Sequence, residues 1–168
     1  MRTAVALGSN LGDRVENLRG ALEAIAGISK VKPPILSSAI YETDPVDCEP
    51  GAKKFLNAVV EFAYEGDPVT LLDQLIRIEE VLGRSRDHPK NTSRPIDIDL
   101  LYCGDGMIEN ERLKLPHPRM HLRKFVLKPL ADIRPELILP GQTRSVSRLL
   151  AEVCESGEVV RLLEAQPF

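Results

Sequence analysis

Two aspartates with a spacing suited to metal chemistry lie in the segment RPIDIDLL, residues 94–101. A β-strand repeats every two residues, so Asp97 and Asp99 are expected on one face, with the apolar residues between them on the other. Paired carboxylates on a rigid strand suit hard divalent cations, which prefer oxygen ligands. Arg94 lies just upstream, and metal ions together with arginines are the usual equipment of phosphoryl transfer. The alternative is a solvated acidic face on a half-exposed strand, which a bare DxD motif alone would favour.

Cationic residues gather in two other stretches of the chain. The range 112–131 has no acidic residue, and its cations are Arg112, Lys114, Arg119, Arg123, Lys124 and Lys128. A second basic stretch contains Arg84, Arg86, Lys90 and Arg94. Locally basic segments in an otherwise acidic chain indicate a small polyanionic ligand, although a solvated cationic surface is the alternative for the lysines.

Length and composition set the class of protein. The chain has 168 residues, 43% of them hydrophobic, which predicts one globular domain over 1–168. The net charge of −3 argues against a general nucleic-acid binder. We expect no membrane segment and no signal peptide, because no apolar run is long enough and the N-terminus lacks the pattern. The odd number of well-separated cysteines, three, fits a reducing cytoplasm.

The order of predicted elements indicates a known α+β arrangement. Strands are expected at 3–7, 35–41, 55–62 and 96–103, and helices follow the capping signals Asp13 and Asp67-Pro68. The resulting order, βαββαβ, predicts a ferredoxin-like sandwich in which two helices pack on one face of an antiparallel sheet. The tail from Leu113 to Phe168 is expected to add short elements broken by prolines.

Two predicted loops are long for a compact domain. One spans residues 42–53 and the other, which is polar and basic, spans residues 84–95. Loops of this length are often functional, so we expect both to act as mobile covers of a ligand site, with plain surface loops as the alternative.

Several blocks together resemble one family of enzymes. In chain order they are ALGSNLGDR, SSAIYETDPV, FLNAVVE, LLDQLIRIEEVLGR, RPIDIDLL, LPHPR, RKFVLKPL and IRPEL. They resemble the 6-hydroxymethyl-7,8-dihydropterin pyrophosphokinase family of folate synthesis over nearly the whole chain. The resemblance implies a ferredoxin-like fold, transfer of pyrophosphate from ATP to the pterin hydroxymethyl group with release of AMP, and a monomer that uses small-molecule substrates.

The resemblance also implies the residues on the phosphate side. It places two magnesium ions on Asp97 and Asp99, where they would bridge the phosphates. The implied catalytic arginines are Arg84 and Arg94. Further implied ATP contacts are Glu79, Arg112, His117 and Arg123.

A second group of residues is implied on the pterin side. Phe55 and Phe125 would enclose the flat ring, and stacked aromatic rings favour offset geometry. Asn57 would pair with the donor–acceptor edge of the ring, and Thr43 would contact the ring through its backbone. Without the resemblance, core packing is the simpler interpretation of each phenylalanine.

Some positions depart from the family pattern. Thr92 replaces a small glycine or alanine, Asn91 replaces an aromatic residue, and Asp44 replaces a proline. None of these changes touches the metal or arginine positions.

Two other functions stay open at this point. A different metal-dependent phosphoryl transferase would use the same aspartates and arginines on another acceptor. A ferredoxin-like ligand-binding module is the second alternative, because a fold does not determine a function. The sequence GSNLGD lacks the Gly-Lys-Ser/Thr ending of a P-loop, so that mechanism is excluded.

Overall fold

A computed structural model describes residues 1–46, 50–83, 93–154 and 159–161. The first half of the chain gives β1 (Arg2–Ser9), α1 (Arg14–Ala26), β2 (Val31–Ser37), β3 (Tyr41–Thr43), β4 (Phe55–Tyr64) and α2 (Pro68–Val81). The second half gives β5 (Asp97–Cys103), β6 (Ile108–Glu109), β7 (Lys114–Leu115), the short 3-10 helix η1 (Met120–Leu122), α3 (Lys124–Ile133), α4 (Val146–Glu152) and β8 (Val159–Arg161). Arg84, Asn91 and Thr92 lie outside the described residues, as do residues 47–49 of the first predicted loop and the rest of 84–92 in the second.

The main sheet has the strand order of the predicted ferredoxin-like fold. Its neighbours run β5-β1-β4-β3-β8, with β2 also paired to β4, and all of these pairs are antiparallel. The central strand β1 therefore lies between β4 and β5, the strand that carries the two aspartates. The predicted α+β fold is confirmed, and β8 adds a C-terminal strand at the edge beyond β3.

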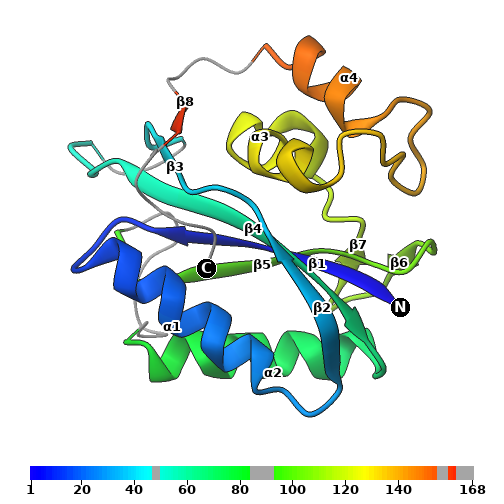
Figure 1. Cartoon of the computed structure of the whole chain (residues 1–168), viewed down its shortest axis with the longest axis horizontal. Helices are drawn as coiled ribbons and strands as arrows, with labels where there is room; N and C mark the ends of the chain where they lie inside the picture. Colours follow the sequence, from blue (N-terminus) through cyan, green and yellow to red (C-terminus); the bar gives the residue numbers. More distant parts are fainter. Residues whose placement is uncertain (47–49, 84–92, 155–158, 162–168) are drawn as a thin grey trace.

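Two helices cover one face of this sheet, as the sequence predicts (Figure 1). Helix α1 begins where the Asp13 side chain accepts the Glu16 N–H, and α2 begins where Asp67 accepts the Thr70 N–H, with Pro68 in the first turn. Their inward residues pack with the strands into one core, represented by Leu18, Ile25, Leu71 and Leu75, all 0% exposed. This core supports the back of β5.

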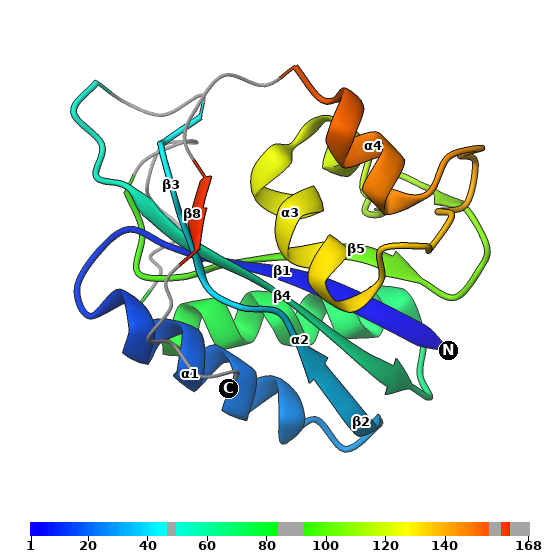
Figure 2. The same cartoon turned by 45° about the horizontal axis from the view of Figure 1, so that its top comes forward.

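The C-terminal region covers the opposite face, so the molecule has three layers (Figures 1 and 2). Helix α3 packs on the sheet and α4 packs on α3, and their buried residues, among them Val126, Leu127 and Val146, form a second core with β1, β4 and β5. Pro129 lies inside α3 and does not break it, contrary to the prediction. None of the helices in the described ranges has the length and apolar character needed to cross a membrane.

The strand predicted at 35–41 is divided in two, which the sequence analysis did not anticipate. Strand β2 ends at Ser37 and β3 begins at Tyr41. Between them the buried Ser38 hydroxyl accepts the Val59 N–H, and the Ala39 N–H donates to Asp132 on α3. Both strands pair with β4, but three residues (38–40) lie opposite two (58 and 59), so one extra residue interrupts the regular ladder before β3 starts.

Candidate active site

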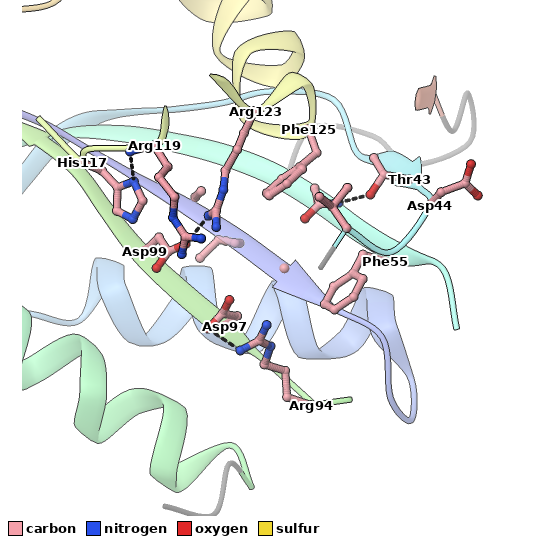
Figure 3. A pocket seen from close by; sticks show the side chains of 15 residues that line it. Thr43, Asp44, Phe55, Arg94, Asp97, Asp99, His117, Arg119, Arg123 and Phe125 are labelled. Atoms are coloured by element: carbon pink, nitrogen blue, oxygen red, sulfur yellow. Dashed lines mark hydrogen bonds and ion pairs between the residues drawn. The ribbon is translucent and has the colours of Figure 1, made fainter. Parts of the chain in front are cut away.

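A pocket of about 200 Å³ lies at the end of the sheet beside the start of α3 (Figure 3). Its walls come from segments far apart in the sequence. They are formed by Ala6, Leu7, Gly8, Thr43, Asp44, Val46, Phe55, Asn57, Arg94, Asp97, Asp99, His117, Arg119, Arg123 and Phe125. The fold thus brings nine of the twelve predicted site residues to one cavity.

Strand β1 supplies a floor of small residues between the two functional walls. Gly8 pairs with Asn57 on one side and with Asp97 on the other. A Cβ atom added to Gly8 would lie 3.1 Å from the Asn57 amide oxygen, 3.7 Å from the Phe55 ring and 3.9 Å from the Asp97 Cβ. The missing side chain therefore keeps open the space between the amide wall and the carboxylate wall.

The paired aspartates face the pocket, as the period-two pattern predicts. Asp97 and Asp99 are partly exposed, whereas the alternating Ile96, Ile98 and Leu100 are buried. Arg94 Nη1 lies 3.5 Å from Asp97 Oδ1, and Arg123 Nη1 lies 3.6 Å from Asp99 Oδ2 (Figure 3). Each carboxylate thus has a cation beside it.

The same two arginines also contact the two phenylalanines. The Arg94 guanidinium carbon lies 5.9 Å from the centre of the Phe55 ring, and that of Arg123 lies 5.3 Å from the centre of the Phe125 ring. Both distances are within the range of cation–π attraction. The arginines therefore lie at the junction between an aromatic part of the pocket and a carboxylate part.

A buried amide completes the aromatic part. Asn57 and Thr43 are 6% and 3% exposed, and the Asn57 amide nitrogen donates to the Thr43 hydroxyl oxygen at 2.6 Å. This bond fixes the amide at the wall, where its remaining donor and acceptor capacity can serve a heterocycle held between Phe55 and Phe125.

His117 is held in a defined orientation after strand β7. Its backbone N–H donates to the Leu101 carbonyl at 2.7 Å, and its Nδ1 accepts the Arg119 N–H at 3.3 Å. Burial lowers the pKa of His117 below its ordinary value, and the charges of Arg123 and Arg119 lower it further, against the opposing effect of Asp99. The neutral ring then carries its proton on Nε2, where it can donate to an anion.

The sequence analysis did not identify two residues that position or complete the site. Asn10, 1% exposed, accepts the Arg94 N–H at 2.7 Å and donates its backbone N–H to the Arg94 carbonyl at 3.2 Å. Its amide nitrogen also donates to Ser93 and to the Lys53 carbonyl. Arg119 points toward Asp99 (Figure 3), and its guanidinium has no hydrogen bond or ion pair with the described residues. In the sequence, Arg119 is one of several cations in the range 112–131, and no local pattern distinguishes Asn10.

Three predicted residues are not placed in the pocket. Glu79 is buried on α2 and accepts the Ile98 N–H at 2.7 Å. Arg112 forms an exposed ion pair with Asp73 on the outer side of α2. Arg84 lies outside the described residues. The ATP contacts of these three residues stay predictions.

The carboxylate part of the pocket suits magnesium bound together with a nucleotide. The described residues contain no group of three or more histidine, cysteine or acidic side chains that could hold a metal ion without other ligands. Magnesium commonly binds to one or two carboxylates, with substrate phosphates and water completing its shell. Asp97 and Asp99 fit this mode of binding.

Sequence comparison assigns the chain to one group of enzymes. The family described as 7,8-dihydro-6-hydroxymethylpterin-pyrophosphokinase (HPPK) matches residues 4–135. A relative from Haemophilus influenzae, named 2-amino-4-hydroxy-6-hydroxymethyldihydropteridine pyrophosphokinase, is 36% identical over 163 residues, covering 97% of both chains. A relative of the same name from Bacillus subtilis is 45% identical over 134 residues, covering 77% of this chain and 75% of the relative.

Solved structures agree on the fold. A crystal structure of HPPK-DHPS in complex with substrates aligns with a TM-score of 0.71 over 89% of this chain at 16% identity. The Plasmodium falciparum HPPK-DHPS structure with pterin and p-hydroxybenzoate aligns with a TM-score of 0.69 over 90% of this chain at 18% identity. The present chain spans only 42% and 41% of those longer chains. Taken with the sequence matches, these likenesses lead to one conclusion: the chain belongs to the 7,8-dihydro-6-hydroxymethylpterin-pyrophosphokinase family.

Proposed function

We propose that this protein transfers pyrophosphate from ATP to the hydroxymethyl group of 6-hydroxymethyl-7,8-dihydropterin, producing AMP and the pterin diphosphate for folate synthesis. One observation supports this function above the others. A single pocket joins an aromatic part, formed by Phe55, Phe125 and Asn57, to a carboxylate part with arginines. That combination suits one flat heterocycle and one polyphosphate side by side.

The aromatic part would bind the pterin. The ring lies between Phe55 and Phe125 in this proposal, and Asn57, fixed by Thr43, pairs with its polar edge. The hydroxymethyl group then extends past Gly8 toward Asp97, because Gly8 pairs with both Asn57 and Asp97. The acceptor oxygen is thereby held next to the site of the phosphates, which removes much of the entropic barrier to reaction.

The carboxylate part would bind ATP with two magnesium ions on Asp97 and Asp99. When bound, the ions offset negative charge on the phosphates. Arg94 and Arg123 then turn from the aspartates to the phosphate oxygens. Arg94 Nε is buried and has no hydrogen-bond partner in the described part of the chain, so a phosphate would satisfy a donor that is otherwise unpaired. His117 donates from Nε2 to the same group of oxygens.

The transfer itself exchanges one phosphorus–oxygen bond for another. The pterin hydroxymethyl oxygen attacks the β-phosphorus and gives up its proton to solvent. The bond from that phosphorus to the oxygen bridging to the α-phosphorus breaks, and AMP leaves with the bridging oxygen. The protein contributes positioning and charge stabilisation, which dominate catalysis of this reaction class. Arg84, Arg112 and Glu79 remain proposed contacts on the ATP side.

We also propose that residues 1–168 act as one domain and as a monomer in the cytoplasm. The pocket is built from the residues of one chain, and β8 joins the C-terminal region to the main sheet. The free thiols of Cys103 and Cys154 fit a reducing compartment.

Product analysis by chromatography tests the proposed reaction. Purified protein would be mixed with ATP, magnesium and the reduced pterin, beside the variant Asp97→Asn. We expect AMP and the pterin diphosphate with the unmutated protein, and at least a thousandfold less with the variant, about 4 kcal/mol of lost charge stabilisation. ADP as the product would indicate an ordinary kinase, and the absence of any nucleotide product would favour a binding module.

A further inference from the structure

A buried carboxylate lies behind the strand that carries the two aspartates. Glu79 is on the inner face of α2, and only 7% of it is exposed. Its Oε1 accepts the backbone N–H of Ile98 at 2.7 Å. Ile98 is the residue between Asp97 and Asp99, so Glu79 is bonded to the backbone at the centre of the DxD motif.

Strand β5 has particular need of such a bond, because it lies at the edge of the main sheet. The single strand paired with it among the described strands is β1, where Leu7 is opposite Ile98. In an antiparallel strand, the backbone N–H and C=O groups of every second residue point toward the partner strand, and those of the residues between them point away. The Ile98 N–H points away from β1 to Glu79. The backbone N–H and C=O groups of the flanking Asp97 and Asp99 therefore face β1. Glu79 therefore supplies the hydrogen bond that a further strand would otherwise provide.

Packing alone does not explain an acidic residue at this position. The neighbouring inward residues of α2, Leu71 and Leu75, are fully buried and apolar. A buried carboxylate carries a desolvation penalty that an apolar side chain would avoid. A hydrogen bond to a charged acceptor is about twice as strong as a neutral one, which makes the carboxylate an effective anchor for the backbone.

We propose that Glu79 is a positioning residue, which holds the backbone of Ile98 so that Asp97 and Asp99 present their carboxylates together to divalent cations. This proposal rests on the proposed function, because it treats the two aspartates as the cation-binding site. It differs from a direct contact between Glu79 and ATP, since Glu79 acts here through the strand.

The first test measures the strand without substrates or metal ions. Hydrogen exchange of the Ile98 amide would be followed by NMR in the unmutated protein, in Glu79→Gln and in Glu79→Leu. The glutamine keeps an acceptor oxygen, whereas leucine removes it. We expect exchange at Ile98 to be at least tenfold faster in Glu79→Leu and intermediate in Glu79→Gln. Glu80→Gln is the matched control, because it makes the same change of charge at the next residue of α2, which is less buried than Glu79, and it should leave the ratio of Ile98 exchange to global unfolding unchanged.

The second test measures cation binding with Mn²⁺ as the probe. Electron paramagnetic resonance would report free Mn²⁺ in the presence of α,β-methylene ATP, which cannot transfer pyrophosphate. We expect about tenfold weaker Mn²⁺ binding in Glu79→Leu, partial recovery in Glu79→Gln and no change in Glu80→Gln. Unchanged Ile98 exchange, or faster exchange with unchanged Mn²⁺ affinity, would overturn the proposal. If both quantities change as expected while the unmutated protein makes no AMP, the positioning role stands and the proposed reaction fails.

Discussion

Single residues in the pocket balance one another's charge. The lining contains three carboxylates, Asp44, Asp97 and Asp99, and three guanidinium groups, Arg94, Arg119 and Arg123. Arg94 and Arg123 lie beside Asp97 and Asp99 in the structure. Arg119 differs, because its guanidinium has no hydrogen bond or ion pair within the described ranges. It is therefore available to an incoming anion without first leaving a partner.

Replacing Arg119 should weaken nucleotide binding more than pterin binding. Arg119→Gln removes a charge-assisted contact of about 1.5 kcal/mol, so the KM for ATP should rise roughly tenfold while the KM for the pterin changes little. Steady-state kinetics with each substrate varied in turn would measure both constants. Lys114→Gln, which removes an exposed cation paired with Glu109, is the control. Equal effects of the two substitutions would contradict a specific role for Arg119.

His117 should make the folded protein less stable in mild acid. Because burial lowers the pKa of His117 in the fold, the unfolded chain binds a proton more readily, starting near the ordinary value of about 6.5. The free energy of unfolding should therefore fall as the pH drops below that value, and this cost should vanish above it. Urea denaturation at neutral pH and at about one unit below pH 6.5 would measure the difference. His117→Gln should reduce this difference between the two pH values. An equally large difference in the variant would show that the pH dependence does not come from His117.

Strand β1 determines the shape of the site at the scale of elements. Its small residues Ala6 and Gly8 face the pocket between β4 and β5, and Asn10 at its end holds the backbone of Arg94. The proposed pterin wall, the proposed cation-binding aspartates and Arg94 are thus all positioned by a single central strand.

Adding a side chain to the floor should block the pterin. Gly8→Val would crowd the Asn57 amide, because even a Cβ atom would lie 3.1 Å from its oxygen. We expect the KM for the pterin to rise at least tenfold, about 1.4 kcal/mol, with the fold retained. Gly20→Ala, in the middle of α1, is a matched control that should leave both KM values unchanged. An unaltered KM for the pterin in Gly8→Val would show that the ring does not bind above this strand.

Local patterns in the sequence were sufficient to predict most elements, but not their interruptions. Helices α1 and α2 begin at Asp13 and Asp67 as predicted, since capping depends on residues within one turn. The break before β3 depends on Val59 and Asp132, which are distant in the chain, so no local pattern could reveal it. The same reason explains why Asn10 was missed, because its partners Lys53, Ser93 and Arg94 are distant in the chain. The proposed metal and pterin residues come from the family resemblance, and the spacing of Asp97 and Asp99 alone left several alternatives.

The whole molecule is built around one sheet with a core on each face. The C-terminal layer must be fixed accurately on that sheet, because it supplies Arg123 and Phe125. A buried cluster helps to fix it: Glu61 on β4 accepts from Tyr102 at 2.5 Å and from Arg134, at the end of α3, at 2.7 Å. Burial and the bond to Glu61 raise the pKa of Tyr102 well above its ordinary value, so this phenol remains a donor.

Removing Arg134 should loosen the C-terminal layer. Arg134→Met leaves the carboxylate of Glu61 buried without its main cation, and the free energy of unfolding should fall by about 2 kcal/mol. This loss is smaller than that of a fully buried pair, because the Arg134 side chain is 37% exposed. Urea denaturation would measure it, with Arg144→Met, which removes an exposed ion pair to Glu152, as the control. A loss no larger than that of the control would contradict a role for the cluster in holding α3.

The fate of the β-phosphorus of ATP tests the central claim most directly. ATP labelled at the β-phosphorus would be incubated with magnesium, the reduced pterin and the protein, and the products would be separated by chromatography. A pocket that directs the hydroxymethyl oxygen to the β-phosphorus predicts that the label moves to the pterin product while unlabelled AMP is released. Label retained in ADP, with a singly phosphorylated pterin, would contradict pyrophosphoryl transfer.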